Sequence, residues 1–509
     1  MTSAFLALYT LTLAVLGFVL LKPRRRLPPG PAGWPLIGNA LNIPSKAPWK
    51  VYLRWSKEYQ SDILSLRLPG APLIILNSAK AVNDLLVKQS AIYSDSMGMS
   101  WVFGLMQYGE QWRNHRKLFH REFEIEGKPA VRGHTIRAVR QLLNRLLTSK
   151  NNYARELQLT TGDTILSVTY GIAVNREDDY FIKLAESLVY ALTEVARAPF
   201  LVDMFPVLRF LPAWIPGAGF QKKARQWERL GFETRAKPFE YVKSEMAKGT
   251  PRPSVAANFI ASLKEGDTET ENVMRNILAE AYLGCRISGS VPELKLSCKT
   301  VGTLCSFTLA MALFPHVQKK AQTAVDTLLR GQRLPDFSDY GQIPYLDALV
   351  SEVLRWNPGA PLGLFHAASK DGYYNGYFIP KGSMIAPNVW AILHDETVYG
   401  RQPVDFIPER FLTEDGEKNN LVPDPDAAFG FGRRLCPGRV MGRELLWLTA
   451  ASILAVFDIS NPIDKNGEPF DPSKIEYTNS MSSRPPYFDC TFTLRRTISE
   501  SLVLDGVVD

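Results

Sequence analysis

A ten-residue loop near position 436 constrains this chain more than any other feature of its sequence. Residues 429–438 read Phe-Gly-Phe-Gly-Arg-Arg-Leu-Cys-Pro-Gly, and an apolar stretch that predicts a helix follows them. A cysteine binds metal as its thiolate. The amides of a tight turn, a following helix N-terminus and the neighbouring Arg434 all favour negative charge at Cys436. The loop is therefore a setting for a metal-bound thiolate.

The fixed residues of this loop resemble a known motif. Phe429, Gly432, Arg434, Cys436 and Gly438 match every fixed position of Phe-x-x-Gly-x-Arg-x-Cys-x-Gly, the haem-ligand loop of the cytochrome P-450 superfamily. A lone cysteine is as often an inert thiol, so the prediction depends on the motif. The resemblance implies that Cys436 is the axial ligand of haem b iron. The two glycines then let the backbone bend where a side chain would collide with a flat cofactor.

Charged residues ahead of the loop fit the same family. Glu352 and Arg355 lie three residues apart, so they share one face of a helix and can form an ion pair. Such a pair is usually exposed and contributes little, but its flanking residues here are apolar. The resemblance implies that Glu352, Arg355 and Arg410 form a buried charge network on the proximal side of the haem.

Further residues match the family's partners of the two haem propionates, which need cations or hydrogen-bond donors once partly buried. Trp112 and Arg116 lie one helical turn apart, as in the family's Trp-x-x-x-Arg helix. Arg434 comes from the cysteine loop. His366 lies where relatives often have a histidine or an arginine. A histidine beside Phe365 is about as often a core residue, so both interpretations stay open for His366.

The patterning predicts a mainly α-helical chain with a small β region. No Ser/Gly-rich or charged linker divides the 509 residues, so we expect one large catalytic domain over residues 41–509. The family's haem fold typically fills this length as one unit. Periodicity and turn signals predict strands at 63–68 and 73–77, a helix from Ala79, and helices around 138–147, 220–248, 304–329 and 438–457.

The first 21 residues carry no charged side chain and are long enough to cross a bilayer as a helix. The basic residues 22–26 follow the apolar run, which favours a transmembrane anchor over a cleaved signal peptide. Because these positive charges lie between the apolar run and the rest of the chain, they predict that the catalytic domain is cytosolic. Residues 22–40 then form a basic, proline-rich hinge. Together with the resemblance, this implies a single-pass protein of the endoplasmic reticulum membrane.

Composition and motifs limit the partners. The net charge of +8 is modest for this length and partly due to the cluster after residue 21, which argues against nucleic-acid binding. No flavin- or dinucleotide-binding segment is recognisable, and the resemblance implies that NADPH supplies electrons through a separate membrane flavoprotein reductase. Arg113, Lys117, Arg433 and Arg439 belong to segments that the family places near the proximal haem face. They are candidates to steer an acidic redox partner.

Residues 285–299 depart from the family pattern. Most relatives carry an acid and an alcohol in the long helix above the haem, within a stretch similar to Ala-Gly-Ala-Asp-Thr-Thr. Here Ala281–Gly284 and Thr300–Phe307 look like parts of that helix, but the atypical insert between them holds no Asp-Thr pair. Pro292 would break or kink a helix interior.

Two explanations of the insert stay open. It is either translated non-coding sequence that displaces the acid and the alcohol, or a real bulge. In the second case Ser288 or Thr300 would be the substitute hydroxyl and Glu293 a distant acid. If the bulge is real, we expect electron consumption to be poorly coupled to product formation, because reduced oxygen would be released as peroxide.

The resemblance implies a monooxygenase that inserts one atom of O2 into a substrate, since a thiolate ligand favours O–O cleavage. Family comparison suggests a substrate pocket with mostly apolar side chains, which favours a hydrophobic small molecule. The candidates are Met99, Trp101, Phe103, Leu364 and Ser480. Each apolar candidate by itself is more often an ordinary core residue.

A finer resemblance rests on Phe307–Met311, on Pro315–Gln322, on the hinge and on the cysteine loop. These segments resemble the O-methylsterigmatocystin oxidoreductase-like group of fungal monooxygenases. That group acts in secondary metabolism on terpenoids, polyketides and aromatic compounds. Two alternatives remain because the acid-alcohol pair is missing: a haem-thiolate isomerase or dehydratase that does not use O2, and a catalytically impaired haem protein.

Overall fold

The structure is a computed structural model. It describes residues 25–35, 37–96, 101–124, 129–148, 152–174, 179–197, 208, 210–212, 214–215, 219–284, 299–460, 463, 467–469, 475–478, 482–486, 488–496 and 500–505. The predicted anchor at 1–21, the pocket candidates Met99 and Ser480, and all of the insert except Lys299 lie outside these ranges.

The fold is mainly helical. The helices are α2 (Pro48–Glu58), α3 (Ala79–Val82), α4 (Ser90–Tyr93), α5 (Glu110–Phe119), α6 (Pro129–Thr148), α7 (Tyr153–Tyr170), α8 (Tyr180–Arg197), α10 (Gly219–Ala247), α11 (Val255–Ser262), α12 (Thr268–Gly284), α13 (Lys299–Leu313), α14 (Pro315–Leu329), α15 (Pro344–Trp356), α16 (Val389–Leu393), α17 (Glu396–Tyr399), α18 (Arg439–Val456) and α19 (Glu500–Asp505). Short helical turns are η1 (Ala40–Asn42), η2 (Asn83–Lys88), η3 (Phe103–Leu105), η4 (His120–Glu124), η6 (Pro408–Phe411), η7 (Asp426–Phe429) and η8 (Gly432–Arg434).

The strands form one four-stranded sheet and two small ribbons. The sheet has the order β1 (Ile63–Leu66), β2 (Leu73–Leu76), β6 (Met384–Pro387) and β3 (His366–Ala367), in which only the β2–β6 pair is parallel. The ribbons pair β4 (Gly372–Tyr374) with β5 (Tyr377–Ile379), and β7 (Phe457–Ile459) with β8 (Phe492–Leu494).

Both faces of the sheet are covered, which explains why β1 and β2 are apolar apart from Ser65. Alternate side chains of a strand point to opposite faces. Ile63 therefore packs in the cluster that includes Val82 of α3, while Leu64 packs in the cluster that includes Tyr52 of α2. Every residue of both strands is buried.

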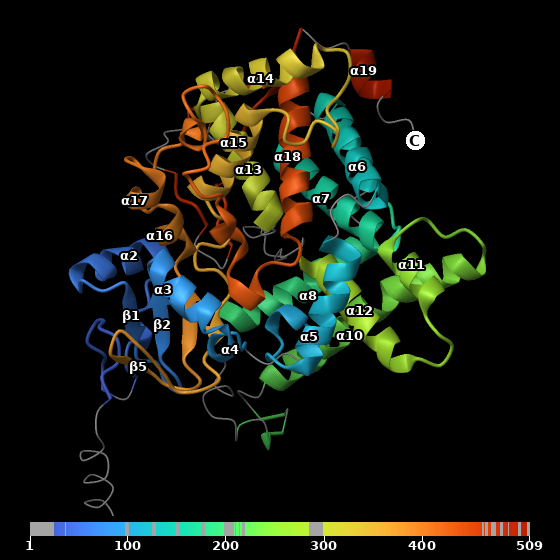
Figure 1. Cartoon of the computed structure of the whole chain (residues 1–509). Helices are drawn as coiled ribbons and strands as arrows, with labels where there is room; N and C mark the ends of the chain where they lie inside the picture. Colours follow the sequence, from blue (N-terminus) through green and yellow to red (C-terminus); the bar gives the residue numbers. More distant parts are fainter. Residues whose placement is uncertain are drawn as a thin grey trace, which may run out of the picture.

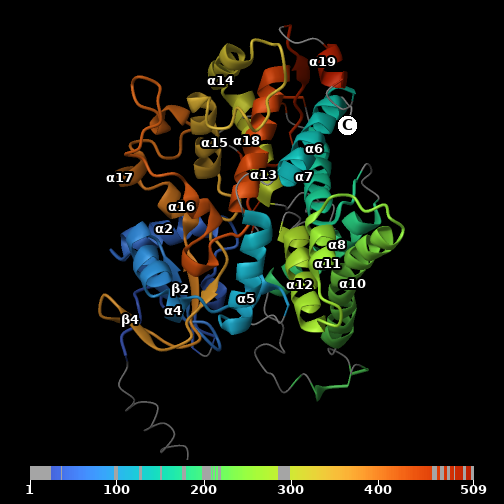
Figure 2. The same ribbon diagram turned by 45° about the vertical axis from the view of Figure 1, so that its right-hand side comes forward.

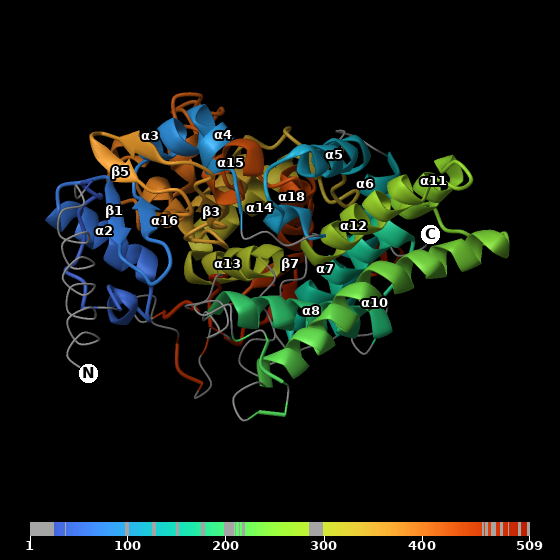
Figure 3. The same cartoon turned by 90° about the horizontal axis from the view of Figure 1, so that it is seen from below.

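The largest core lies in the helical part of the molecule. In Figures 1 and 2, α13 and α18 run through its centre, with α15 on one side and α6 and α7 on the other. Residues 444–456 of α18 are all buried, because helices cover this helix on several sides. Seen from below in Figure 3, α8 and α10 lie side by side away from the sheet.

The predicted strands and most predicted helices are present, with one correction. Residues 304–329 do not form one helix, because α13 ends at Leu313 and α14 starts with Pro315 in its first turn. A proline lacks the N–H that a continuous helix would need, and its ring clashes with the preceding turn. The two helices meet at an angle of 105°.

Part of the predicted hinge is docked on the sheet. The Ser65 N–H of β1 donates to the Pro29 carbonyl at 2.9 Å, and the Ser65 hydroxyl donates to the Pro28 carbonyl at 2.6 Å. Among the described residues no single helix has the length and hydropathy to cross a membrane. Only α13 and α14 taken together reach that length and hydropathy, and this pair is bent.

The cysteine loop contacts the sheet-bearing region through Gly432. This residue has φ +55°, and an added Cβ atom would lie 2.1 Å from the backbone oxygen of Leu86 in η2. Moving either backbone segment away would cost free energy. A glycine at 432 is therefore required for packing within the protein itself.

Replacing Gly432 should lower the stability of the fold. We expect Gly432→Ala to reduce the free energy of unfolding by at least about 2 kcal/mol, because of the positive φ and the overlap with Leu86. Gly442→Ala is the matched control, since its nearest neighbour would be Phe429 at an ordinary 3.8 Å and an alanine favours the helix. Denaturant unfolding measures both, and equal stabilities of the two variants would contradict this account of Gly432.

Candidate functional site

Cys436 lies at the end of a tightly folded loop. Its backbone N–H donates to the Phe429 carbonyl at 2.8 Å and closes the turn. Gly430, at φ +92°, lets the chain reverse inside the turn. Cys436 is half-buried, and an added Cβ atom at Gly438 would meet no atom within 4 Å. The cysteine is thus held on a rigid backbone next to open space.

Arg434 fixes the loop to the segment before α5. Its guanidinium donates to the carbonyls of Ser94 at 2.8 Å, Phe103 at 3.1 Å and Met106 at 2.5 Å. It also lies 4.9 Å from the ring centroid of Trp112. Burial lowers the pKa of Arg434 to about 10, so it remains a cation at neutral pH.

Helix α5 approaches the loop from the other side. Arg116 donates from Nη1 to the Leu435 carbonyl at 2.8 Å, directly beside the cysteine. One turn earlier, the Trp112 side chain is buried and its Nε1–H has no acceptor among the described residues. An unpaired buried N–H costs about 1 to 3 kcal/mol. An acceptor supplied from outside the chain would remove this cost.

His366 is buried next to Arg434. Its Nδ1 must donate to the Tyr93 carbonyl, which lies 2.8 Å away and can only accept. Burial, with a smaller effect from the Arg434 cation, lowers the pKa of His366 to about 4, so the free ring is neutral. In that tautomer Nε2 carries no proton. Nε2 can therefore donate a hydrogen bond to a carboxylate only if that carboxylate raises the pKa of the ring, so that Nε2 becomes protonated.

The ion pairs of the predicted charge network are present and buried. Arg355 donates from Nε and Nη2 to Glu352 at 2.7 and 2.9 Å, and both side chains are fully buried. Arg410 lies 3.2 Å from the same carboxylate. The remaining N–H groups of Arg355 donate to the carbonyls of Leu393, Pro403 and Asp405. The network thus joins α15 to the segment that leads toward the cysteine loop.

Of the predicted pocket residues, three lie in the described part of the chain. Phe103 is buried in η3, and Leu364 keeps 39% of its surface accessible. Trp101 lies 5.1 Å from the Arg235 guanidinium of α10 and would be 3.3 Å from a Cβ atom at Gly231. Trp101 therefore links the segment before α5 to α10.

Sequence reasoning missed Glu280, an acidic residue of α12. The Gly104 N–H donates to its carboxylate, while Oε2 is buried without a partner in the described chain. Burial raises the pKa of Glu280 to about 7. Protein surrounds the side chain, yet part of its surface is accessible, as expected for a residue that lines an enclosed space. A glutamate in an otherwise apolar helical stretch was the available signal.

A polar chain runs beside Glu280. Asn276, one turn earlier on α12, accepts from Arg235 at 3.2 Å and contacts the Nε2 atom of His115 at 3.2 Å. His115 Nδ1 lies 2.8 Å from the Gln111 carbonyl. These contacts tie α10, α12 and α5 together around the segment that carries Phe103.

Known proteins identify the family. The cytochrome P450 family matches residues 28–488. The chain is 58% identical to the cytochrome P450 monooxygenase eriA of Hericium erinaceus, over 95% of this chain and 92% of that protein. It is 38% identical to the cytochrome P450 monooxygenase ple1 of Rhodocybe pseudopiperita, over 95% and 92% of the two chains. It is 36% identical to tryptamine 4-monooxygenase of Psilocybe cyanescens, over 93% and 94%.

This chain belongs to the cytochrome P450 family and is an oxidoreductase of the haem-thiolate monooxygenase class. The family uses haem b, and electrons typically come from NADPH through a reductase. The residues described above fit that cofactor: a half-buried cysteine beside open space, two nearby arginines and an indole N–H that has no acceptor within the described ranges. Cys436 would hold the iron, and Trp112, Arg116 and Arg434 would hold the propionates. Bound haem supplies thiolate-assisted activation of O2.

The unpaired indole of Trp112 allows a direct test of this fit. We expect Trp112→Phe to speed haem loss to an acceptor protein roughly tenfold, because it removes one donor to a charged group. Trp447→Phe is the control, since its Nε1–H already donates to Asp347 at 2.7 Å within the protein. That control should lower stability and leave the rate of haem loss near the wild-type value. Equal haem loss from the Trp112→Phe variant and the wild type would contradict the assignment of Trp112.

The raised pKa of Glu280 predicts a pH dependence of folding. Between pH 4.5 and about 7 the folded protein keeps a proton on Glu280 that the unfolded chain has lost. The contribution of this group to the unfolding free energy therefore falls as pH rises through that window, by something on the order of 3 kcal/mol, and is constant above it. Denaturant unfolding at pH 5 and pH 7.5 should show a smaller loss for Glu280→Gln than for wild type. The exposed Glu269→Gln variant of the same helix should behave as wild type, and an unchanged pH dependence in Glu280→Gln would refute the assignment.

Proposed function

We propose that this monooxygenase inserts one oxygen atom of O2 into a hydrophobic small molecule of fungal secondary metabolism, of terpenoid, polyketide or aromatic type. The proposal rests first on Cys436, which lies beside open space near Arg116, Arg434 and Trp112. The Trp112 N–H has no acceptor in the chain as far as the structure describes it. The relatives support it, since each is a fungal protein named as a monooxygenase.

The surroundings of Glu280 narrow the substrate class. Phe103 and Met106 are buried apolar side chains on the segment that contacts α12, and Trp101 packs beside them. Glu280 is the acidic group at this position, and its Oε2 has no hydrogen-bond partner in the part of the chain that the structure describes. We propose that it accepts a hydrogen bond from a hydroxyl or amine of an otherwise apolar substrate. A free buried oxygen favours such a substrate over a pure hydrocarbon, which would leave it unpaired.

Electrons would reach the haem from NADPH through a membrane flavoprotein reductase. Arg113 and Lys117 of α5 are exposed, as is Arg433 of the cysteine loop. A basic surface near Cys436 favours an acidic partner through long-range attraction. We further propose that residues 1–21 anchor the protein in the endoplasmic reticulum membrane, with the catalytic domain in the cytosol.

A reconstituted reaction tests the proposal. Purified protein in vesicles with a flavoprotein reductase should show the thiolate-type carbon monoxide difference spectrum, consume NADPH and incorporate one labelled atom from ¹⁸O2 into a product found by mass spectrometry. Cys436→Ala should lose the spectrum and the product. Cys490→Ala should keep both, because burial raises the pKa of that thiol to about 12 and keeps it protonated.

Other outcomes separate the remaining alternatives. A product that forms without NADPH would indicate an isomerase or dehydratase. A haem spectrum without any product from a broad panel of apolar metabolites would indicate an impaired haem protein. Either result would overturn the monooxygenase proposal for this chain.

The insert needs an experiment of its own. α12 ends at Gly284 and α13 begins at Lys299, so a variant in which Gly-Ala-Asp-Thr replaces residues 285–299 restores the family pattern ahead of Thr300. This variant should convert more of the consumed NADPH into product and release less peroxide. Sequencing the transcript decides the origin of the insert, since its presence in the message of active protein would refute the non-coding explanation.

A further inference from the structure

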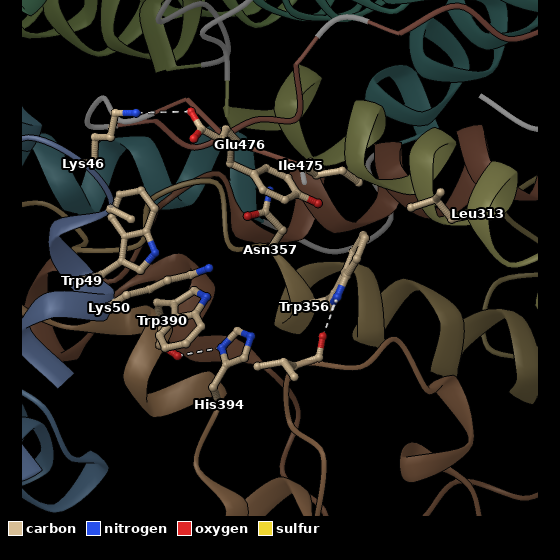
Figure 4. Close-up of a pocket in the computed structure, with 13 residues that line it drawn as sticks. Lys46, Trp49, Lys50, Leu313, Trp356, Asn357, Trp390, His394, Ile475 and Glu476 are labelled. Atoms are coloured by element: carbon tan, nitrogen blue, oxygen red, sulfur yellow. Dashed lines mark hydrogen bonds and ion pairs between the residues drawn. The ribbon is translucent and has the colours of Figure 1, made fainter. Parts of the chain in front are cut away.

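A cavity of about 340 Å³ lies on another part of the molecule, away from the residues assigned to the haem. It is bounded by the start of α2, by the last residues of α13 and α15, by α16 and by residues 475–477. Figure 4 shows its labelled side chains around a common space. Neither the cysteine loop nor α5 contributes to its lining. Its volume is at the lower end of the range for small-molecule sites, which is about 300 to 1,000 Å³.

Aromatic rings form much of the cavity lining. Trp390 and His394 of α16 stack with their centroids 4.0 Å apart and their planes at 18°. Trp356, at the end of α15, meets Tyr477 edge to face at 6.4 Å, and its Nε1–H donates to the Val404 carbonyl at 3.0 Å. Trp49 of α2 is 4% exposed. Rings fixed in this way present flat surfaces that favour a planar ligand.

The cavity also carries an excess of positive charge. Lys46 pairs with Glu476 at 3.6 Å, which leaves Lys50 as the second cation of the lining. Lys50 lies 5.5 Å from the Trp390 ring and has no ion-pair partner in the chain as described. Burial, and then the nearby Arg355 cation, lower the pKa of His394 to about 3, so its ring adds no charge. The charged lining residues therefore sum to one positive charge.

The N-terminus of α2 adds to this preference. α2 begins at Pro48, between the lining residues Ala47 and Trp49, and a helix N-terminus favours an anion.

We propose that this cavity binds a planar aromatic carboxylate of one or two rings, at a site separate from the haem. The rings pack against the Trp390 and Trp356 side chains, and the carboxylate pairs with Lys50. An aromatic amine is disfavoured, because Lys50 would repel it. A neutral aromatic compound would leave Lys50 without an ion-pair partner.

Calorimetric titration of the intact haem protein with naphthalene-2-carboxylate tests the proposal, with the neutral naphthalene-2-carboxamide as matched ligand. We expect the carboxylate to bind wild type about tenfold more tightly than the carboxamide does, which is the scale of one charge-assisted contact. Lys50→Gln should remove that preference. Lys57→Gln, an exposed lysine on the same helix, should leave both affinities unchanged.

The haem spectrum separates this site from the substrate pocket. Binding in the cavity should leave the Soret band of the ferric protein unchanged, since no residue of the cysteine loop or α5 lines it. Equal affinities for the two ligands, an unaffected Lys50→Gln variant, or carboxylate binding that shifts the Soret band and disappears in Cys436→Ala would each overturn the proposal. None of these outcomes depends on turnover, so failure here and failure of the monooxygenase proposal are distinguishable.

Discussion

The rest of the site depends on the ion pairs of the buried Glu352 carboxylate. This carboxylate accepts two hydrogen bonds from Arg355 and one from the backbone N–H of Ile407, and it pairs with Arg410. A buried charge is tolerated only with partners of this quality, and removal of one partner typically costs about 3 to 5 kcal/mol. The arginines also donate to backbone carbonyls of residues 393–405, so they hold this segment against α15. The cysteine loop follows this segment in the chain.

Two of the unpaired polar atoms in the described part of the chain are best explained by a bound group. Trp112 Nε1 belongs to a side chain that packs against Arg434 of the cysteine loop, and Glu280 Oε2 lies on α12. Native proteins pair most buried polar groups, so each exception needs an explanation. In this chain a haem propionate and a polar group of the substrate supply two explanations that differ in chemistry and can be tested separately.

Local patterns in the sequence predicted features that depend on neighbours in the chain. Spacing along one helix indicated the Glu352–Arg355 pair, and turn signals indicated the strands β1 and β2. The contact of Arg410 with Glu352 was predicted only through the family resemblance. The break at Pro315 shows the limit of a periodicity argument, since one missing N–H divides an otherwise continuous pattern. The contact of Gly104 with Glu280 joins segments far apart in the sequence, and no local pattern encodes it.

The sequence by itself determined the family, the thiolate residue and the helical class, because a short motif with fixed spacing and the period of apolar residues both survive in one dimension. Only the tertiary structure decided three further properties. A side chain at position 432 would overlap the backbone of Leu86, the pKa of Glu280 is raised, and Lys50 lines an aromatic cavity. Each of those properties is set by which atoms surround a group in space. Burial and partner geometry arise when distant segments pack, and composition does not record them.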